Sequence, residues 1–232
     1  MNRTEGRAVN VLTSVSGLKE AGVILLLLKP GVTDAEVESF IAKKGGQGDP
    51  NRASKYGSLV FDAEAEPGHA SEAQTYLQPG QYLALATSGE GGPKFHTQFT
   101  VAAAASPVAL PAPQATVRSI ESGFRGPSTL HKGELVRFEN EGYLVHMDAA
   151  FQVKDMKTAK KLVKALLAGN EKAANKLAIG GVIFAGPLSS GAFQQETITA
   201  KPGIYVQACF MDTQDHRSHT MLGMERIIKI VT

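Results

Sequence analysis

The chain has 232 residues, a length that suits one large domain or two domains of about 100 to 150 residues each. Hydrophobic residues make up 43% of it and charged residues 20%, which suffices for a globular core, and the net charge of +2 indicates no polyanionic partner. Aromatic residues make up only 6% and tryptophan is absent, so the sequence has no evident platform for stacking on bases, and we expect no nucleic-acid partner.

The N-terminal part of the chain is polar and contains no hydrophobic stretch typical of a signal peptide. An apolar run at 23–28 is too short to span a bilayer and is followed at once by Lys29, Pro30 and Gly31. We therefore expect no integral membrane segment. The single cysteine, Cys209, excludes an internal disulfide and is compatible with either redox compartment.

The first half of the chain is expected to combine strands with one helix. The segment TDAEVESFIAKK at 33–44 predicts a helix, because Thr33 is a good N-cap and acidic residues follow it. The segment LQPGQYLALAT at 77–87 predicts a tight Pro-Gly turn and then a strand that starts near Tyr82. The uncharged segment ASPVALPAPQA at 105–115 contains three prolines and is typical of an extended linker.

The second half is rich in short β-branched or aromatic segments bounded by Gly, Pro or Asn, which predict strands. The clearest are VRFEN, VIFAG, ETITA, IYVQACF and RIIKIV. A helix is predicted at 156–170, where apolar residues recur at helical spacing and Gly169 or Asn170 can end it. Its apolar stripe consists of Ala159, Leu162, Val163, Leu166 and Leu167.

The two halves show the same order of features, with a helix, a Gly-rich loop and then final strands. Both contain the pattern P-G-x-Y followed by alternating apolar residues, at 79–82 and at 202–205. We therefore predict a mainly β protein with two tandem Greek-key β-sandwiches, each with a helical insertion. The predicted domains are 1–104 and 116–232, joined by the Ala/Pro linker at 105–115.

Residues able to bind a metal gather near the end of the chain, in CFMDTQDHRSHTMLGM at 209–224. This stretch holds the only cysteine, two of the six histidines and three of the six methionines. Upstream, the segment GELVRFENEGYLVH at 133–146 ends in a further histidine. A thiolate and two imidazoles in a trigonal arrangement, with a distant thioether, suit a copper ion that cycles between two oxidation states.

These segments together resemble the cupredoxins, the small blue-copper β-sandwich proteins such as plastocyanin. In 133–146, a Gly opens a strand, an Asn ends it and a histidine comes thirteen residues after the Gly, as in that family. The segment 203–209 has the pattern G-x-Y-x-x-x-C, which resembles the family's approach to its ligand cysteine. The segment 219–224 has the plastocyanin-like spacing of the second histidine and the axial methionine, and an apolar strand follows it.

The resemblance implies a cupredoxin-like fold and one copper ion in the second half. It implies that His146, Cys209 and His219 are equatorial ligands and that Met224 is the axial ligand. It also implies electron transfer or copper handling, a redox carrier rather than an enzyme, and a redox partner protein. A secreted or periplasmic location follows from the same resemblance, with the leader absent from this chain.

Two features depart from the family pattern: the loop after Cys209 is long, and the segment between His146 and the next clear strand is enlarged by the predicted helical insertion. Nine residues separate Cys209 from His219, a much longer loop than in the well-studied blue-copper proteins, and a long loop costs more entropy to order. His216 lies closer to the cysteine but loses the spacing to the axial methionine, and Met221 is a rival thioether. In the first half, the position that matches Cys209 is Ala86, so we expect that domain to be metal-free.

Other interpretations stay open at this point. A buried cysteine often acts as a small hydrophobe, and buried histidines often have structural roles, so the protein could be a metal-free structural or interaction module with the same fold. A copper storage or delivery protein that uses the Met-rich loop is a third possibility. The basic residues of the predicted helix could dock an acidic redox partner, although a solvated helix face accounts for them more simply. They are Lys157, Lys160, Lys161 and Lys164.

Overall fold

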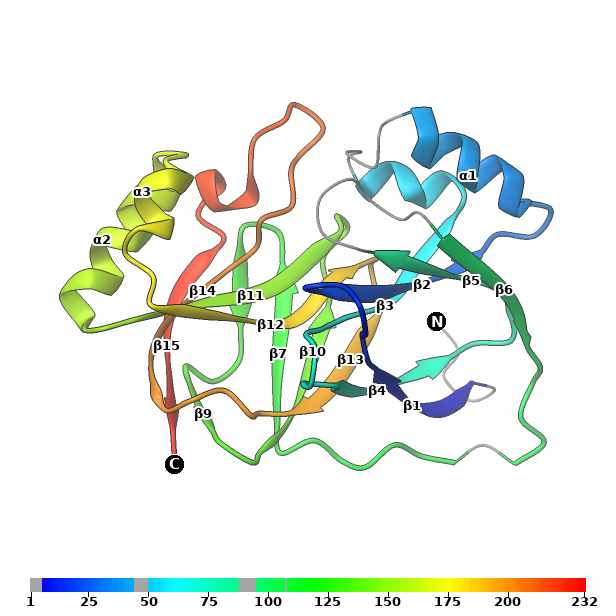
Figure 1. The fold of residues 1–232 in the computed structure, drawn as a ribbon, viewed down its shortest axis with the longest axis horizontal. Helices are drawn as coiled ribbons and strands as arrows, with labels where there is room; N and C mark the ends of the chain where they lie inside the picture. Colours follow the sequence, from blue (N-terminus) through cyan, green and yellow to red (C-terminus); the bar gives the residue numbers. More distant parts are fainter. Residues whose placement is uncertain (1–5, 44–49, 88–94, 107) are drawn as a thin grey trace.

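The computed structural model describes residues 6–43, 50–87, 95–106 and 108–232 of the chain. In this part, two β-sandwiches lie side by side, and each has a helical insertion between two of its strands (Figure 1). The predicted fold class, a mainly β protein with two tandem sandwiches, is therefore confirmed.

The first sandwich packs a four-stranded antiparallel sheet against a pair of strands. The sheet consists, in spatial order, of β3 (Gly57–Ala65), β2 (Ala21–Leu28), β5 (Gly80–Thr87) and β6 (Phe95–Val101). The facing pair is β1 (Arg7–Thr13) and β4 (Ser71–Leu77). The core between the two layers consists of Leu25, Val60, Phe61, Ala63, Ala73, Leu77, Tyr82 and Val101.

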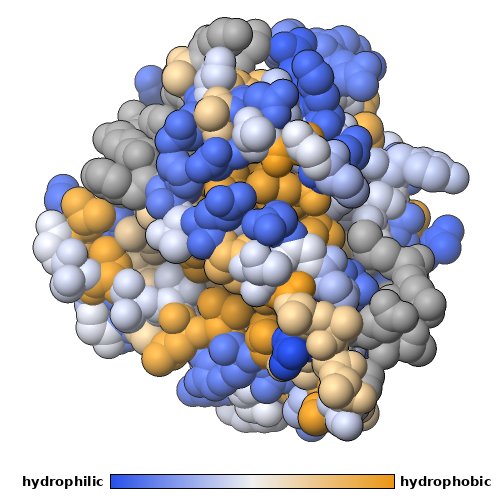
Figure 2. All heavy atoms as spheres, turned by 90° about the vertical axis from the view of Figure 1, so that its right-hand side faces the viewer, coloured by the Kyte–Doolittle hydropathy of each residue, from blue (hydrophilic) through white to orange (hydrophobic). Residues whose placement is uncertain are grey.

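Helix α1 (Asp34–Lys43) and the 3-10 helix η1 (Pro50–Lys55) lie between β2 and β3 along the chain. Thr33 caps α1 as predicted, because its hydroxyl accepts the N–H of Glu36 at 3.3 Å while the Glu36 carboxylate accepts the N–H of Thr33 at 2.9 Å. The apolar cluster beside α1 also contains Val145 from the second half, so the two halves share part of a core. At this end of the molecule, apolar side chains lie among hydrophilic ones on the surface (Figure 2).

The second sandwich has one sheet with the order β12 (Gly180–Leu188), β11 (His146–Val153), β14 (Gly203–Ala208), β15 (Glu225–Val231) and β9 (Thr129–His131). The strands that face it are β13 (Phe193–Thr197), β10 (Leu135–Asn140), β7 (Ala115–Ile120) and β8 (Gly123–Arg125). Phe138 and Phe184 stack in the core between the layers with ring centroids 4.9 Å apart.

Helices α2 (Met156–Leu167) and α3 (Glu171–Asn175) form the insertion between β11 and β12. Helix α2 begins where predicted, with Asp155 accepting the N–H of Thr158 at 2.7 Å. The predicted apolar stripe is buried at Ala159, Leu162 and Leu166. Leu167 is an exception, since it is the last residue of α2 and its side chain is 45% exposed.

The two sandwiches are joined edge to edge as well as through their cores. Strand β4 of the first half and β13 of the second half meet at Gln74 and Gln195, which extends one sheet to six strands in the order β1-β4-β13-β10-β7-β8. The Gln195 amide also donates to the Gln74 side-chain oxygen at 2.9 Å. The described residues between β6 and β7, at 102–106 and 108–114, run along one edge of the molecule (Figure 1). The domain boundaries proposed around 105–115 stay a prediction.

Within the described ranges, no helix combines the length and the apolar character that crossing a bilayer requires.

Candidate metal centre

Three side chains of metal-binding type meet in the interior of the second sandwich. His146 is the first residue of β11, and Cys209 follows the last residue of β14, which pairs with β11. His219 is the first residue of the 3-10 helix η2 (His219–Leu222), which lies just before β15. Each of the three residues is at most 2% exposed. Within the described residues they are the one group of three or more His, Cys, Asp or Glu side chains close enough to hold a metal ion.

The donor atoms of these side chains face one another. The Nδ1 atoms of His146 and His219 are 3.2 Å apart, and the Cys209 Sγ lies 3.7 Å from the first and 3.3 Å from the second. A triangle with these sides has its centre about 2 Å from each corner, a typical length for a bond between a metal ion and an imidazole nitrogen. Two imidazoles and a thiolate in a trigonal set are the donors found in blue-copper sites. The residues present therefore fit a copper ion.

Burial shifts the pKa values of His146 and Cys209 in opposite directions. Loss of hydration, and then the neighbouring His219 ring, lower the pKa of His146 to about 4, so this imidazole is neutral at pH 7. Burial raises the pKa of the Cys209 thiol to about 12. A neutral imidazole is the form that binds a metal, whereas the thiol needs a nearby cation to lose its proton.

The backbone around the cysteine holds it in place. The N–H of Met147 donates to the Cys209 Sγ at 3.4 Å, and the N–H of Cys209 donates to the Met224 carbonyl at 3.2 Å. On the other side of His146, the Asn140 amide donates to the carbonyls of Leu144 and Leu188, both at 2.7 Å. The Asn that sequence analysis placed at the end of a strand thus fixes the turn that leads to the first histidine.

The long loop between Cys209 and His219 closes on itself. Asp212 and Ser218 form an isolated antiparallel bridge, and the N–H of His219 donates to the carbonyl of Met211 at 2.8 Å. The loop therefore forms a small hairpin, and its extra residues do not separate the two ligand-type side chains. The entropy cost anticipated from the loop length is offset by these internal hydrogen bonds.

The first half of the molecule also contacts the loops of the centre. Asn51 in η1 accepts the N–H of Val145 at 2.7 Å and donates to the carbonyl of Asp212 at 3.3 Å. Sequence reasoning missed Asn51, because hydrogen bonds to backbone groups on distant segments leave no local pattern in the sequence.

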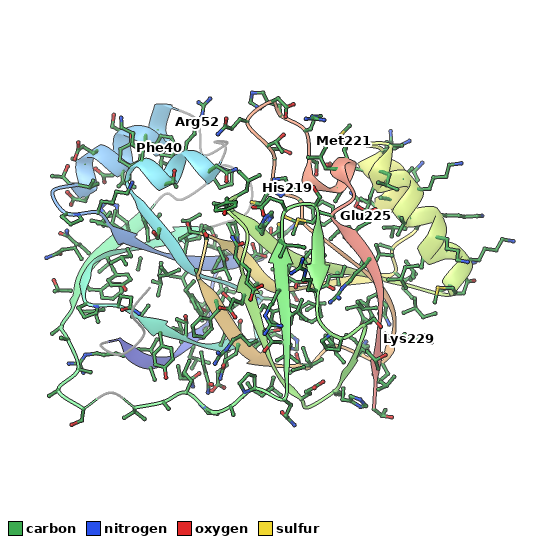
Figure 3. The ribbon with its side chains drawn as sticks, turned by 180° about the vertical axis from the view of Figure 1, so that it is seen from behind. Phe40, Arg52, His219, Met221, Glu225 and Lys229 are labelled. Carbon is green, nitrogen blue, oxygen red and sulfur yellow. The ribbon has the colours of Figure 1, made fainter. Side chains whose placement is uncertain are left out.

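The remaining candidates differ in their placement. The Met224 side chain is fully buried, and its N–H donates to the carbonyl of His219 at 3.0 Å. Met221 is 42% exposed, and its thioether packs against Gly169 after α2, beside the helices and away from the cluster (Figure 3). His216 is exposed on the hairpin, with a left-handed φ of 61°. The structure thus brings His219, and not His216, to the cysteine.

A carboxylate that sequence analysis did not single out lies behind His146. The Glu121 Oε1 is 3.8 Å from the His146 Nε2. Partial burial opposes ionisation of Glu121, but hydrogen bonds from backbone N–H groups, among them those of Tyr143 and Leu144, hold its pKa below the ordinary value.

The strand arrangement and the position of this centre, between the start of β11 and the segment that joins β14 to β15, agree with the family pattern in the sequence. The fold is cupredoxin-like. No protein-family model matches the chain, and no curated protein sequence matches it significantly.

Several solved structures resemble half or nearly all of this cupredoxin-like chain, all at low identity. Reduced auracyanin from Roseiflexus castenholzii is 17% identical, with 50% of this chain and 95% of that one covered and a TM-score of 0.30. Auracyanin A, a blue copper protein from Chloroflexus aurantiacus, is 22% identical, with 50% and 98% covered and a TM-score of 0.27. Copper nitrite reductase from Nitrosomonas europaea is 13% identical, with 98% and 80% covered and a TM-score of 0.26.

Proposed function

We propose that the second half of the chain binds one copper ion through the Nδ1 atoms of His146 and His219 and the Sγ of Cys209. The observation that carries this proposal is the triangle of three buried donor atoms that face one another at 3.2 to 3.7 Å. Met224 is proposed as a weak axial ligand, because its side chain is fully buried and its backbone bonds to the segments of both other loop ligands.

A bound copper ion supplies one-electron chemistry, and we propose electron transfer as the role of the protein. The donors come from two paired strands and a hydrogen-bonded hairpin, so they can keep nearly the same positions in both oxidation states. Because each of the three donor residues is at most 2% exposed, a substrate cannot reach the centre unless the structure opens, whereas an electron does not need direct contact with the donor atoms. A carrier therefore fits the centre better than a catalyst.

We propose that the redox partner is an acidic protein that docks on the lysine-rich insertion. The segment 154–176 contains seven lysines and two acidic residues, so it carries a net charge of +5 while the whole chain carries +2. Within the described residues none of these lysines forms a salt bridge with a carboxylate, and nitrogen-tipped side chains project from the helices into solvent (Figure 3). Helix α2 contacts η2, which begins with His219, so a partner docked there would lie beside the centre.

We also propose that the protein acts outside the cytoplasm, a location supported by its resemblance to the cupredoxins, which are usually secreted or periplasmic. Cell fractionation of the native host, with an antibody against the chain, tests this location. Recovery of the full-length protein from the cytoplasm alone would contradict it.

A metal-free structural module is the second candidate. One observation favours it, namely that the two imidazoles and the thiol can hydrogen-bond to one another at the distances found, so the cluster can be stable without an ion. In that case the three residues hold the loops together and do no redox chemistry.

Titration with Cu(II) separates the two candidates. A thiolate–copper bond absorbs strongly in the visible region, so we expect an intense band that saturates at one ion per chain. Cys209→Ala should lose the band, and His131→Ala, which changes an exposed histidine, should keep it. A wild-type protein that takes up no copper, and carries none when purified from its native host, would favour the metal-free module. A colourless protein that retains Cu(I) would favour copper storage.

A further inference from the structure

We propose that Glu121 is a positioning residue for His146: its carboxylate keeps the imidazole proton on Nε2 and leaves the Nδ1 lone pair directed at Cys209. This inference rests on the proposed copper site. It concerns the protein's own residues, and it can be measured on the metal-free protein.

The carboxylate is fixed by the loop that it faces. Glu121 follows β7, and its Oε1 accepts the backbone N–H of Tyr143 and also that of Leu144, the latter at 3.2 Å. The same oxygen lies 3.8 Å from the His146 Nε2. The same Glu121 oxygen therefore accepts hydrogen bonds from the turn before β11 and lies next to the ring of His146, the first residue of β11.

A glycine makes this approach possible. A Cβ atom placed on Gly142 would lie 2.7 Å from the Glu121 Oε1 and also 2.7 Å from the His146 Nε2. Any side chain at position 142 would therefore stand between the carboxylate and the ring. Position 142 therefore requires a glycine, because a larger residue would collide with both Glu121 and His146. The sequence alone did not reveal this requirement.

An ionised carboxylate is a hydrogen-bond acceptor and never a donor, so Glu121 favours the His146 tautomer that carries its proton on Nε2. Within the described residues, the His146 Nε2 makes no hydrogen bond, and the Glu121 carboxylate lies 3.8 Å from it. The Nδ1 lone pair then faces the Cys209 sulfur and the second imidazole. A metal ion requires this tautomer, and carboxylates placed behind ligand histidines are known to fix it.

The negative charge has a second effect. A carboxylate close to a ligand stabilises the more highly charged oxidation state of the metal, so Glu121 should strengthen Cu(II) binding and lower the reduction potential of the centre.

The test compares Glu121→Gln with Glu141→Gln. Glu141 follows β10, in the segment that leads to His146, and its side chain is 42% exposed where that of Glu121 is 43% exposed. It pairs with Arg118 at 2.8 Å, so its replacement removes the same charge without removing the carboxylate beside His146. The glutamine oxygen at position 121 can still accept the N–H groups of Tyr143 and Leu144, which preserves the loop.

The first readout is the ¹⁵N chemical shifts of the His146 ring in the metal-free protein at pH 7.5. We expect Nε2 protonation in the wild type and in Glu141→Gln, and a rise of the Nδ1-protonated form in Glu121→Gln. The second readout is copper binding, in which Glu121→Gln should weaken Cu(II) affinity about tenfold and raise the potential relative to Glu141→Gln.

Equal tautomer populations in the two variants would overturn the role of Glu121, and so would equal copper affinities. A wild-type protein that binds no copper would instead overturn the proposed function, while the ring shifts would still decide whether Glu121 fixes the tautomer.

Discussion

The side-chain oxygen of Asn51 accepts a 2.7 Å hydrogen bond from the backbone N–H of Val145, the residue before His146. The amide of the same side chain donates to the carbonyl of Asp212, in the hairpin between Cys209 and His219. One asparagine of the first half therefore ties together the two segments that carry the candidate ligands. The first half shows no metal-ligand pattern in its sequence, yet it helps to order the candidate metal centre of the second half.

Replacing Asn51 with Ala should loosen both segments. The N–H of Val145 would lose its partner, so we expect the free energy of unfolding to fall by about 1–3 kcal/mol and copper affinity to fall with it. Urea denaturation of the metal-free protein measures the first effect and Cu(II) titration the second. Asn10→Ala removes an exposed hydrogen bond to Glu72 and should change stability by less than about 0.5 kcal/mol. If both variants behaved like the wild type, the coupling between the halves would be absent.

The two histidines of the hairpin can be separated by matched substitutions. His216→Gly should keep the visible copper band, because His216 is exposed and its φ of 61° suits glycine. His219→Gly should lose the band, and added imidazole should restore it by filling the space that the buried ring leaves. Absorption spectra with equimolar Cu(II) measure both effects. Loss of the band in His216→Gly alone would contradict this assignment of the ligand.

Local patterns in the sequence were sufficient for the two main helices and for the type of fold, but not for α3 or the 3-10 helices η1 and η2. Thr33 and Asp155 mark the two main helix starts, because capping is a matter of a few neighbouring residues. The apolar residues of a half-buried helix recur every three to four positions, and those of a half-buried strand recur every second position, so both patterns can be recognised in a sequence. The predicted strand ETITA illustrates the limit, since β13 ends at Thr197 and Ile198 bonds instead to the carbonyl of Glu134 on a distant segment.

The candidate site was predictable only in part. The spacing before His146 and around Cys209 pointed to residues that the fold does bring together, because each lies at a strand end fixed by its own local pattern. The loop length gave a misleading signal, since nothing in the spacing shows that Asp212 and Ser218 pair. Glu121 and the His146 ring belong to segments that are distant along the chain. Their contact results from tertiary packing, which leaves no repeating pattern in the sequence.

The two rival methionines differ in burial, and this difference predicts their effects. Met224→Leu keeps the volume of a fully buried side chain but removes its sulfur, so we expect a shifted reduction potential and a changed copper spectrum. Met221→Leu changes a residue that packs beside Gly169 at the surface and should leave both unchanged. Voltammetry of the copper-loaded variants measures the potential. A shift in Met221→Leu and none in Met224→Leu would assign the axial role to Met221.

A buried carboxyl between the two halves predicts a dependence of stability on pH. Asp62 in β3 is 6% exposed and lies against Gly186 of β12. Burial, and then the charge of Glu64, raise its pKa well above the usual value. The folded protein therefore holds this proton more tightly than the unfolded chain, so the contribution of Asp62 to stability is greatest below about pH 4 and declines as pH rises towards the folded-state pKa.

Asp62→Asn should remove that decline. We expect the variant to be more stable than the wild type at pH 7, by at least about 1 kcal/mol, and nearly equal to it at pH 4. Urea denaturation across this pH range measures the difference. Glu66→Gln, which alters an exposed carboxyl of the same half, serves as the control and should leave the slope unchanged. Identical slopes in wild type and Asp62→Asn would show that the buried carboxyl does not set the pH dependence.

The lysine face of α2 can be tested without knowing the natural partner. A fourfold variant replaces Lys157, Lys160, Lys161 and Lys164 with Gln, and a control variant does the same at Lys19, Lys29, Lys201 and Lys229, which are exposed elsewhere on the surface. Both variants change the net charge equally, so only the position of the charge differs. The copper-loaded, reduced proteins are then oxidised by the anionic complex hexacyanoferrate(III).

At low salt the helix variant should react at least about tenfold more slowly than the control, because the lysines beside η2 attract the anion to the surface over the centre. The difference should vanish near 1 M salt, where charges are screened beyond about 3 Å. A cationic oxidant should reverse the order of the two rates. Equal rates with both oxidants at low salt would show that this face does not guide partners to the centre, and the acidic partner would have to be sought elsewhere.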